Sequence, residues 1–561
     1  MENANFTLET LPYERVSIEE FKTAITSLID RLKNSKSGEE QFEVHKSYYQ
    51  LMNRFNTNYS LANVRHDGNV KDEFYQAEMD YYDEIIPEVQ VLDNEYSKIL
   101  LESPYRDYLE GKIGKVAFKN IEFALKAFSD KVISLAQEEN ALTTEYGKLY
   151  AEVKFLYNGE ELNLSLVGKY LTDGDRNIRI DATKARSAAL EKIKDKLDEI
   201  YDKLVKNRTE QAKLLGFNNY VELGYYRMGR TTYDINDVHS FKEQVKKYLV
   251  PLATKIHEQR RKRLGVDVLD SVDEGIYFDY GNPKPQGTPD DIFAAGKKMY
   301  SELSPETGEF FNFMLEHDLF DVLGRTDKAG GGFMDMLPLY KAPLIFANFN
   351  GTSGDVDVIT HECGHAFQYY VNRDEKINEF NDIKMETAET HSMSMEFFTA
   401  KWAELFFGDK SDDFRKLQLE DAIAFIPYGT MVDEYQEQVY LHPEYTPAER
   451  NKLWQDLEKT FKPHLNYAND EFNGEGRRWQ TQKHIYESPF YYIDYCLAQT
   501  CALQFKALME EDYDKAWNDY LAFCKLSARD TFENMLHEVG LKCPFDEGYM
   551  EELVSKIEKM L

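Results

Sequence analysis

The segment His361-Glu362-Cys363-Gly364-His365 constrains this 561-residue chain more than any other feature, because a helix would bring its two histidines to one point. On an α-helix, residues four apart lie about 40° apart around the axis and about 6 Å along it, so both imidazoles can reach one ion. Glu362 flanks the pair and can hold a carboxylate against a metal-bound water without itself being a ligand. The segment therefore predicts a helix carrying two metal ligands and a general base. An ordinary helix whose histidines line up on a solvated face is the alternative.

A catalytic zinc site needs a third protein ligand, and several carboxylates follow the motif closely enough in sequence to supply one. They are Asp374, Glu375, Glu379, Asp382, Glu386 and Glu389. Glu386 and Glu389 lie in residues 385–396, which we expect to form a second helix that packs against the first. Spacing alone does not choose between these two glutamates.

Three stretches resemble the oligoendopeptidase F branch of the thimet-oligopeptidase-like zinc metallopeptidases: Asn348–Val356, His361–His365 and Glu389–Ser392. The resemblance extends from about residue 205 to residue 560. It implies that Glu389 is the third zinc ligand, that Glu396 is a later acid of the same helix, and that each chain holds one zinc ion. It also implies a two-lobed, helical zincin with the zinc at the bottom of a deep channel, which would admit short peptides and exclude folded proteins.

The C-terminal segment that begins at His484 concentrates hydroxyl and imidazole donors, which a peptide-bond hydrolase needs for the oxyanion of its transition state. In relatives a histidine and tyrosines of this segment contact the substrate or the oxyanion, and the matching residues are His484, Tyr492 and Tyr495, with Tyr495 the leading donor. Tyr486 is a further substrate-binding candidate, with a core position as its alternative. The segment departs from the thimet-type pattern: it lacks the preceding glycine-rich loop, its His-to-Tyr spacing is one residue shorter, and Ser488 replaces an expected tyrosine.

A second substrate-binding candidate is the apolar run Ala342–Phe349, which lies just before the metal motif. We interpret it as an extended segment and an edge strand. The backbone at Ala347 and Phe349 could then pair with an extended peptide without reading its side chains, which would give broad specificity.

These features predict a zinc-dependent endopeptidase that hydrolyses internal bonds of short unstructured oligopeptides. Glu362 would activate a zinc-bound water and pass its proton to the departing amine. One alternative is a peptidyl carboxypeptidase, which would need a cationic group for the terminal carboxylate. Another is a non-catalytic peptide-binding protein, against which Glu362 and a full ligand set argue. Two imidazoles and a carboxylate also accept cobalt or manganese.

Composition limits the classes of binding partner and the cellular compartment that we expect for this chain. There are 67 Lys and Arg against 100 Asp and Glu, a net charge of −33, which would repel nucleic acid. The five cysteines are an odd number without CxxC spacing, which argues against a disulfide framework. The sequence has no secretory signal pattern and no run of about 18 apolar residues. We expect a cytoplasmic protein with reduced thiols and no membrane association; the sequence does not indicate its oligomeric state.

Helix signals dominate the rest of the chain. Ser17 with Glu20, and Thr446 with Glu449, place a hydroxyl and an acid at the spacing of helix N-termini. One long amphipathic helix is expected to follow Asp181 and to end at Leu215, where Gly216 can adopt the left-handed conformation.

The clearest strands are residues 150–157 and 160–167, joined by Asn158-Gly159 in a type I′ turn. The sequence therefore predicts a mainly α fold with small β elements near the active site and in the N-terminal half. Its expected division is an N-terminal helical region with a β-hairpin, residues 1–205, and a zinc metallopeptidase catalytic region, residues 206–561.

Overall fold

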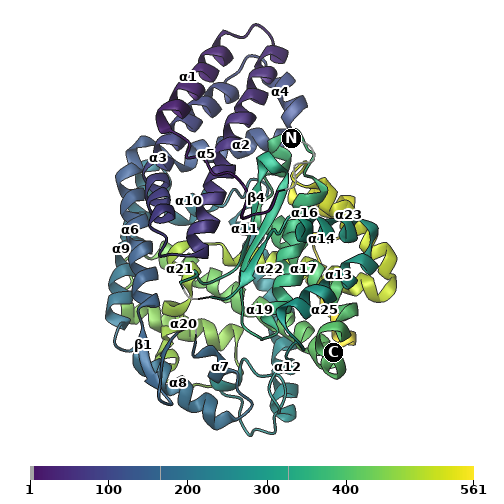
Figure 1. Cartoon of the computed structure of the whole chain (residues 1–561). Helices are drawn as coiled ribbons and strands as arrows, with labels where there is room; N and C mark the ends of the chain where they lie inside the picture. The colour runs from purple at the N-terminus through teal and green to yellow at the C-terminus, as the bar shows by residue number, and fades with distance from the viewer. Residues whose placement is uncertain (1–5, 165, 326) are drawn as a thin grey trace. The chain divides into compact units, whose positions relative to one another are not determined.

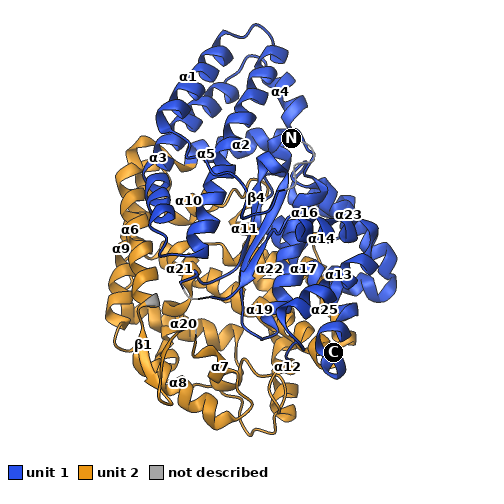
Figure 2. Cartoon of the chain, viewed as in Figure 1, with its two compact units in different colours: residues 1–126, 284–411, 504–542 blue, residues 127–283, 412–503, 543–561 orange. Residues whose placement is uncertain are grey.

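The structure is a computed structural model, which describes residues 6–164, 166–325 and 327–561. The chain forms two compact units, coloured separately in Figure 2, and each unit is assembled from three separate stretches. Unit 1 comprises residues 1–126, 284–411 and 504–542, and unit 2 comprises residues 127–283, 412–503 and 543–561. Each unit groups stretches that pack together and are not consecutive in the chain. The sequence-based division after residue 205 stays a prediction.

Helices make up most of both units, which confirms the predicted mainly α fold class (Figure 1). The main helices and strands of unit 1 are α1 (Ile18–Asn34), α2 (Gly38–Gly68), α3 (Glu73–Leu101), α4 (Arg106–Ile113), α5 (Lys115–Ala127), α13 (Pro289–Leu303), α14 (Pro305–Glu316), β3 (Phe320–Leu323), β4 (Phe333–Leu337), β5 (Ala342–Phe349), α15 (Gly354–Asp357), α16 (Cys363–Val371), α17 (Met385–Thr399), α18 (Glu404–Phe407), α23 (Tyr513–Leu526) and α24 (Phe532–Glu538).

The main elements of unit 2 are α6 (Ile133–Ala151), β1 (Lys154–Tyr157), β2 (Glu160–Asn163), α7 (Gly168–Leu171), α8 (Arg176–Leu190), α9 (Lys194–Leu215), α10 (Tyr220–Arg227), α11 (Ile235–Gln244), α12 (Val250–Arg263), α19 (Ser411–Leu441), α20 (Pro447–Phe461), α21 (Lys483–Glu487), α22 (Tyr492–Glu511) and α25 (Tyr549–Ile557). Within the described residues, no helix has both the length and the apolar character that a membrane span requires.

The N-terminal part of unit 1 is a group of helices around one apolar core. The hydroxyl of Ser17 accepts the N–H of Glu20 and starts α1, as predicted. Phe21 of α1 packs with Phe55 of α2 and Tyr82 of α3 in this core. Helix α2 also packs against β4, so the same helix group supports the sheet that precedes the metal motif.

The sheet of unit 1 has the order β3-β5-β4, with β5 parallel to β3 and antiparallel to β4. Strand β5 is therefore the central strand, and the interpretation of Ala342–Phe349 as an edge strand is wrong. Its first six residues are all buried. A continuous apolar run without alternation is what a strand covered on both faces shows, whereas an edge strand with one wet face alternates.

Two local signals of unit 2 are confirmed. Asn158 and Gly159 have φ angles of 50° and 82°, as a type I′ turn requires, and they join β1 to β2. The strands are shorter than predicted, because Tyr150 still belongs to helix α6. Thr446 and Glu449 form the predicted capping box at the start of α20.

The predicted long helix between Asp181 and Leu215 is wrong in one respect, because a turn at residues 191–193 divides it into α8 and α9. In this turn the N–H of Ile193 donates to the carbonyl of Leu190 at 3.0 Å. The apolar spacing continues through the turn, so periodicity alone did not reveal it. Gly216 ends α9 with a φ of 88°, as predicted.

Candidate metal centre

His361 and His365 lie on one continuous helical segment that is not uniformly α-helical. The segment starts as α15, passes through a π-helical turn, η5 (Val358–Glu362), and continues as α16. His361 lies in the π turn and His365 in the α-helix. The spacing predicted the helix but not the π turn, which inserts one residue and recurs at functional sites of proteins.

The start of this segment is fixed by Asp355. Its two carboxylate oxygens accept the N–H groups of Asn350 and Gly351, each at 2.8 Å, and its side chain is buried. Asn350 and Gly351 directly follow β5, so this contact fixes where the helical segment begins relative to the sheet. Helix α16 then packs against β4 and β5.

The predicted second helix is present as α17, and it packs directly against α16. Gly364 makes this possible. A Cβ atom added at Gly364 would lie 2.6 Å from Cα of Ser392 and 3.1 Å from the carbonyl oxygen of His391, both on α17. The two backbones approach so closely that no side chain fits between them, which places Glu389 beside the two histidines.

Three side chains converge where the two helices meet. Nε2 of His361 and Nε2 of His365 lie 3.4 and 3.6 Å from the same carboxylate oxygen of Glu389. All three ligand atoms lie within 4.8 Å of one another, and in the described part of the chain no other such group is found. A tetrahedral ion with bonds of about 2.0–2.1 Å holds its ligand atoms about 3.4 Å apart, which matches the two histidine–Glu389 separations, so the group could hold one divalent ion such as zinc.

Each of the three side chains has a hydrogen bond outside the group that orients it. Nδ1 of His361 lies 2.6 Å from the carboxylate of Glu396, which is also on α17. His365 hydrogen-bonds to the backbone of Ala388. The hydroxyl of Ser392 donates to the oxygen of Glu389 that faces the histidines, at 3.0 Å. Outer hydrogen bonds of this kind fix the direction of metal ligands.

The electrostatics of the group suit a cation and a base. Burial lowers the pKa of His365 to about 4, which keeps its ring neutral, as a metal ligand must be. Burial would also lower the pKa of His361, but hydrogen bonds to Glu389 and Glu396 raise it well above its usual value. The same negative charge attracts a divalent cation. Burial raises the pKa of Glu362, which moves this carboxyl towards the range of an effective general base.

The other two side chains of interest on these helices are packed in the core. Cys363 is fully buried, and its thiol contacts the hydroxyl of Tyr300 on α13. His391 is also fully buried, between the rings of Phe523 and Tyr520. Neither side chain belongs to the group of His361, His365 and Glu389.

The loop between α16 and α17 is anchored to the N-terminal helices of unit 1. Glu379 accepts hydrogen bonds from Nε2 of His45 at 2.7 Å and from the hydroxyl of Tyr49, both on α2. Asn378 donates to Asn53 of the same helix at 2.9 Å. Glu379, one of the six carboxylates near the motif, thus holds the loop that connects the two ligand-bearing helices.

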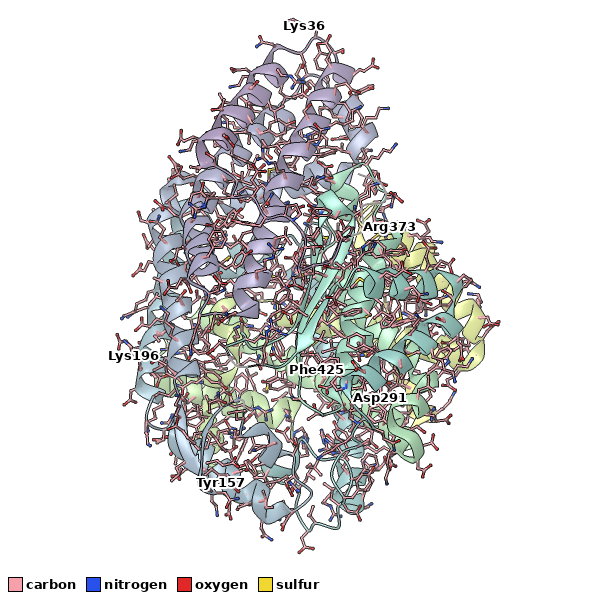
Figure 3. The ribbon with its side chains drawn as sticks, in the orientation of Figure 1. Lys36, Tyr157, Lys196, Asp291, Arg373 and Phe425 are labelled. Carbon is pink, nitrogen blue, oxygen red and sulfur yellow. The ribbon has the colours of Figure 1, made fainter. Side chains whose placement is uncertain are left out.

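The predicted substrate-side donors lie in unit 2, where they form one aromatic cluster. The ring of His484 on α21 lies 5.0 Å from that of Tyr492 and 6.2 Å from that of Tyr495, both in the first turn of α22. Tyr491 completes the cluster, 4.8 Å from Tyr495. Phe425 of α19, labelled in Figure 3, lies against Tyr492 and Tyr495.

Tyr486 occupies a different position from these donors. Its side chain is fully buried, it stacks on Tyr146 with ring centroids 3.9 Å apart, and its hydroxyl donates to the carbonyl of Leu197 at 3.3 Å. This burial agrees with the core alternative for Tyr486. We therefore leave Tyr486 out of the function proposed below.

The end of β5 is also occupied by contacts within unit 1. The carbonyl of Ala347 accepts a hydrogen bond from Nζ of Lys328 at 2.6 Å. Phe349 pairs with Leu323 of β3 and stacks on Phe293. Ala347 and Phe349 stay predicted substrate contacts, but a peptide that adds a strand to this sheet would pair with β3 or β4.

Sequence reasoning missed two residues that hold the ligand group. Ser392 lies three positions after Glu389, a spacing at which helical side chains meet, so a signal for it was available. Tyr300 bonds to Ile359, two residues before His361, from 59 positions away, and no local pattern could have indicated it.

Comparison with known proteins places this geometry in a family. Residues 8–128 match the Peptidase M3 N-terminal domain, and residues 169–278 and 306–555 match peptidase family M3. The chain belongs to peptidase family M3. This M3 chain is an oligoendopeptidase F-like metallo-oligopeptidase, which confirms the resemblance noted in the sequence.

Three solved structures are similar to this M3 peptidase over nearly their whole length. A structure of PZ peptidase A with an inhibitor has 44% sequence identity to this chain and a TM-score of 0.95, and the match covers 99% of this chain and 99% of PZ peptidase A. A structure described as an oligoendopeptidase F is 43% identical, with 99% and 98% covered and a TM-score of 0.95. Another so described, from Bacillus anthracis str. Ames, is 42% identical, with 100% and 98% covered and a TM-score of 0.91. The comparison with curated proteins gave no match.

Proposed function

We propose that this M3 peptidase is a zinc-dependent endopeptidase that hydrolyses internal bonds of short unstructured oligopeptides. The observation that carries the proposal is the convergence of His361, His365 and Glu389 at distances that fit one zinc ion. A zinc ion held there would polarise the scissile carbonyl and lower the pKa of the attacking water. The relatives described as oligoendopeptidase F support a short-peptide substrate.

Glu362 is the proposed general base. It follows His361 directly in the π turn and is not one of the three ligands, so its carboxylate is available to a water molecule beside the ion. It takes a proton from the attacking water and later gives it to the departing amine. Burial raises the pKa of Glu362, which makes its carboxylate a stronger base than an exposed glutamate.

Tyr495 is the proposed donor to the oxyanion, with Tyr492 or His484 assisting. The family resemblance suggests these residues, and their clustering in unit 2 supports a shared role. A phenol and an imidazole N–H both donate to a carbonyl oxygen as negative charge develops on it. Ala347 and Phe349 are retained as proposed contacts of the peptide.

The deciding experiment uses a peptide of about ten residues with an acetylated N-terminus and an amidated C-terminus. The zinc-loaded wild type and its Glu362→Gln variant are incubated with it, and the products are identified by mass spectrometry. Internal cleavage by the wild type alone supports the proposal. If the blocked peptide survives and the same peptide with a free C-terminus is shortened, the peptidyl carboxypeptidase takes its place.

The ligand assignment has its own control within α17. Glu389→Gln should remove bound zinc, measured as metal per chain after gel filtration. Glu386→Gln is the matched control, because Glu386 is buried one helical turn earlier on the same helix and lies outside the ligand group. Equal zinc content in both variants would contradict the role of Glu389.

A further inference from the structure

The π turn η5 lies between two points at which the helical segment is fixed. On the N-terminal side Asp355 binds the backbone after β5, and on the C-terminal side His365 bonds to the backbone of Ala388 on α17. The turn adds one residue between these points compared with a regular α-helix. His361 belongs to the turn, so the direction of its ring depends on whether the turn keeps this form.

Helix α13 contacts the π turn at Ile359. The hydroxyl of Tyr300 donates to the carbonyl of Ile359 at 2.8 Å. Gly296 lies one helical turn earlier on α13, and a Cβ atom there would approach the Ile359 side chain to 3.1 Å. Residues four apart on a helix share a face. Tyr300 therefore binds the backbone of Ile359 while Gly296 leaves room for its side chain.

The hydroxyl of Tyr300 also contacts the thiol of Cys363, the first residue of α16. The hydrogen of this hydroxyl is donated to the carbonyl of Ile359, so the thiol is a neighbour of the same hydroxyl. Tyr300, Ile359 and Cys363 are each fully buried. A buried carbonyl that loses its hydrogen-bond partner bears a desolvation penalty, so the bond from Tyr300 to Ile359 opposes a change in the backbone pairing of the turn.

We propose that Tyr300 is a positioning residue, which maintains the π turn at Ile359 and thereby directs His361 towards the metal. The proposal rests on the zinc-peptidase function proposed above and adds a residue from outside both ligand-bearing helices. A helix gains a backbone hydrogen bond when a π turn reverts to α-helical pairing, so the turn needs an external partner to persist.

Loss of that partner has a defined geometric consequence. Reversion shifts the backbone pairing by one residue. One part of the helical segment would then rotate by about 100° around the axis and move by about 1.5 Å along it relative to the other part. With His365 held at α17, the ring of His361 would turn away from Glu389 or lose Glu396. A zinc ion would keep two protein ligands and bind more weakly.

The test compares Tyr300→Phe with Tyr520→Phe. Tyr520 is the matched control, because it is also fully buried and its hydroxyl donates to a helix carbonyl, that of His391, at 2.9 Å. That carbonyl lies in the regular α-helix α17. The measurements are the zinc dissociation constant by competition with a chromophoric chelator, the visible spectrum of the cobalt(II) form, and the melting temperature without metal.

We expect both variants to melt at lower temperature, and only Tyr300→Phe to bind zinc at least about tenfold more weakly and to alter the cobalt(II) spectrum. Wild-type zinc affinity in folded Tyr300→Phe, or equal weakening in Tyr520→Phe, would overturn the proposal. If Tyr300→Phe does not fold, Gly296→Ala decides the question, because its Cβ presses on Ile359. Unchanged zinc binding in Gly296→Ala would then refute the proposal that contacts of α13 with Ile359 direct His361.

These readouts do not depend on turnover. If the wild type binds zinc but cleaves no peptide, the proposed function fails while the zinc affinities of the variants still test the role of Tyr300. If the wild type cleaves peptides and Tyr300→Phe matches it in zinc affinity and cobalt(II) spectrum, only the further inference fails.

Discussion

The carboxylate of Glu396 lies 2.6 Å from Nδ1 of His361. Because an ionised carboxylate can only accept, the ring donates from Nδ1, and this bond leaves Nε2 directed at Glu389. The nitrogen of His361 that we propose to bind the metal is thus oriented by Glu396, which lies outside the group of His361, His365 and Glu389.

Glu396→Gln tests this orientation. The amide keeps the size of the side chain but loses the charge that favours one ring orientation, so we expect zinc to bind about 10–100-fold more weakly. The measurement is chelator competition, with Glu386→Gln as a variant of the same helix that should retain wild-type affinity. Wild-type affinity in Glu396→Gln would mean that this bond does not orient the ligand.

Glu362→Gln should separate metal binding from catalysis. Glu362 is not a ligand in the observed group, so we expect one zinc per chain in the variant and a fall in kcat of at least about 10²–10⁴-fold. Metal analysis and peptide turnover on the same sample check both numbers. Turnover near the wild-type rate in a fully loaded variant would eliminate Glu362 as the base.

Gly364→Ala should lower stability and zinc affinity together. Its Cβ would lie 2.6 Å from backbone of α17, so the two ligand-bearing helices must separate, at a cost of about 1–3 kcal/mol or more. Gly111→Ala in α4 is the control, since its Cβ meets nothing within 4 Å and should add about 0.5–1 kcal/mol of stability. Chemical unfolding and zinc competition measure the difference; equal behaviour of the two variants would contradict the close approach.

Tyr495→Phe should reduce kcat by about 10²–10³-fold with little change in KM, because an oxyanion donor acts mainly in the transition state. Tyr491→Phe is the matched control from the same aromatic cluster, with no assigned role. Steady-state kinetics on one internally cleaved peptide distinguish them. If the two variants lose activity equally, the loss reflects the packing of the cluster and not a donor.

Acid should destabilise unit 2 through His257 and His464. Their rings stack with centroids 3.5 Å apart. Burial lowers the pKa of His257 to about 2 and that of His464 to about 3. Both rings are neutral when folded, so the unfolded chain binds more protons below pH 6.5, and stability falls from there down towards pH 2–3. For the more deeply buried His257, the expected loss approaches about 1.4 kcal/mol per pH unit.

The measurement is the urea unfolding midpoint between pH 7.5 and pH 4.5. The double variant His257→Gln and His464→Gln should show a flatter dependence on pH than the wild type. His537→Gln replaces an exposed histidine and should leave the dependence as it is. A wild-type slope in the double variant would exclude this pair as its source.

Local chemistry made much of this molecule predictable. Asn158-Gly159 specified a turn, Ser17 and Thr446 specified helix starts, and the spacing of His361 and His365 specified two side chains on one face. In each case the residues that determine the structure lie within a few positions of one another. Such signals are present in the chain before it folds.

Features that depend on distant partners were not predictable. The central position of β5 depends on pairing with β3 and β4. The π turn depends on Tyr300, which is far away in sequence. Thirteen residues lie between the end of α16 at Val371 and the start of α17 at Met385, and only the folded loop shows that Glu379 anchors this connection to α2. No periodicity encodes contacts of this kind.

The close approach of Gly364 to Ser392 has a consequence for the order in which the enzyme is assembled. Because the two backbones touch in a buried interface, we expect their packing to bring the three proposed ligands together before any ion binds. The metal site of such a protein would be preformed, in contrast to that of small zinc domains, which fold only when they bind zinc. A chelator should remove the metal ion and leave a folded, metal-free protein. A different divalent ion should then bind at the same site without refolding of the chain.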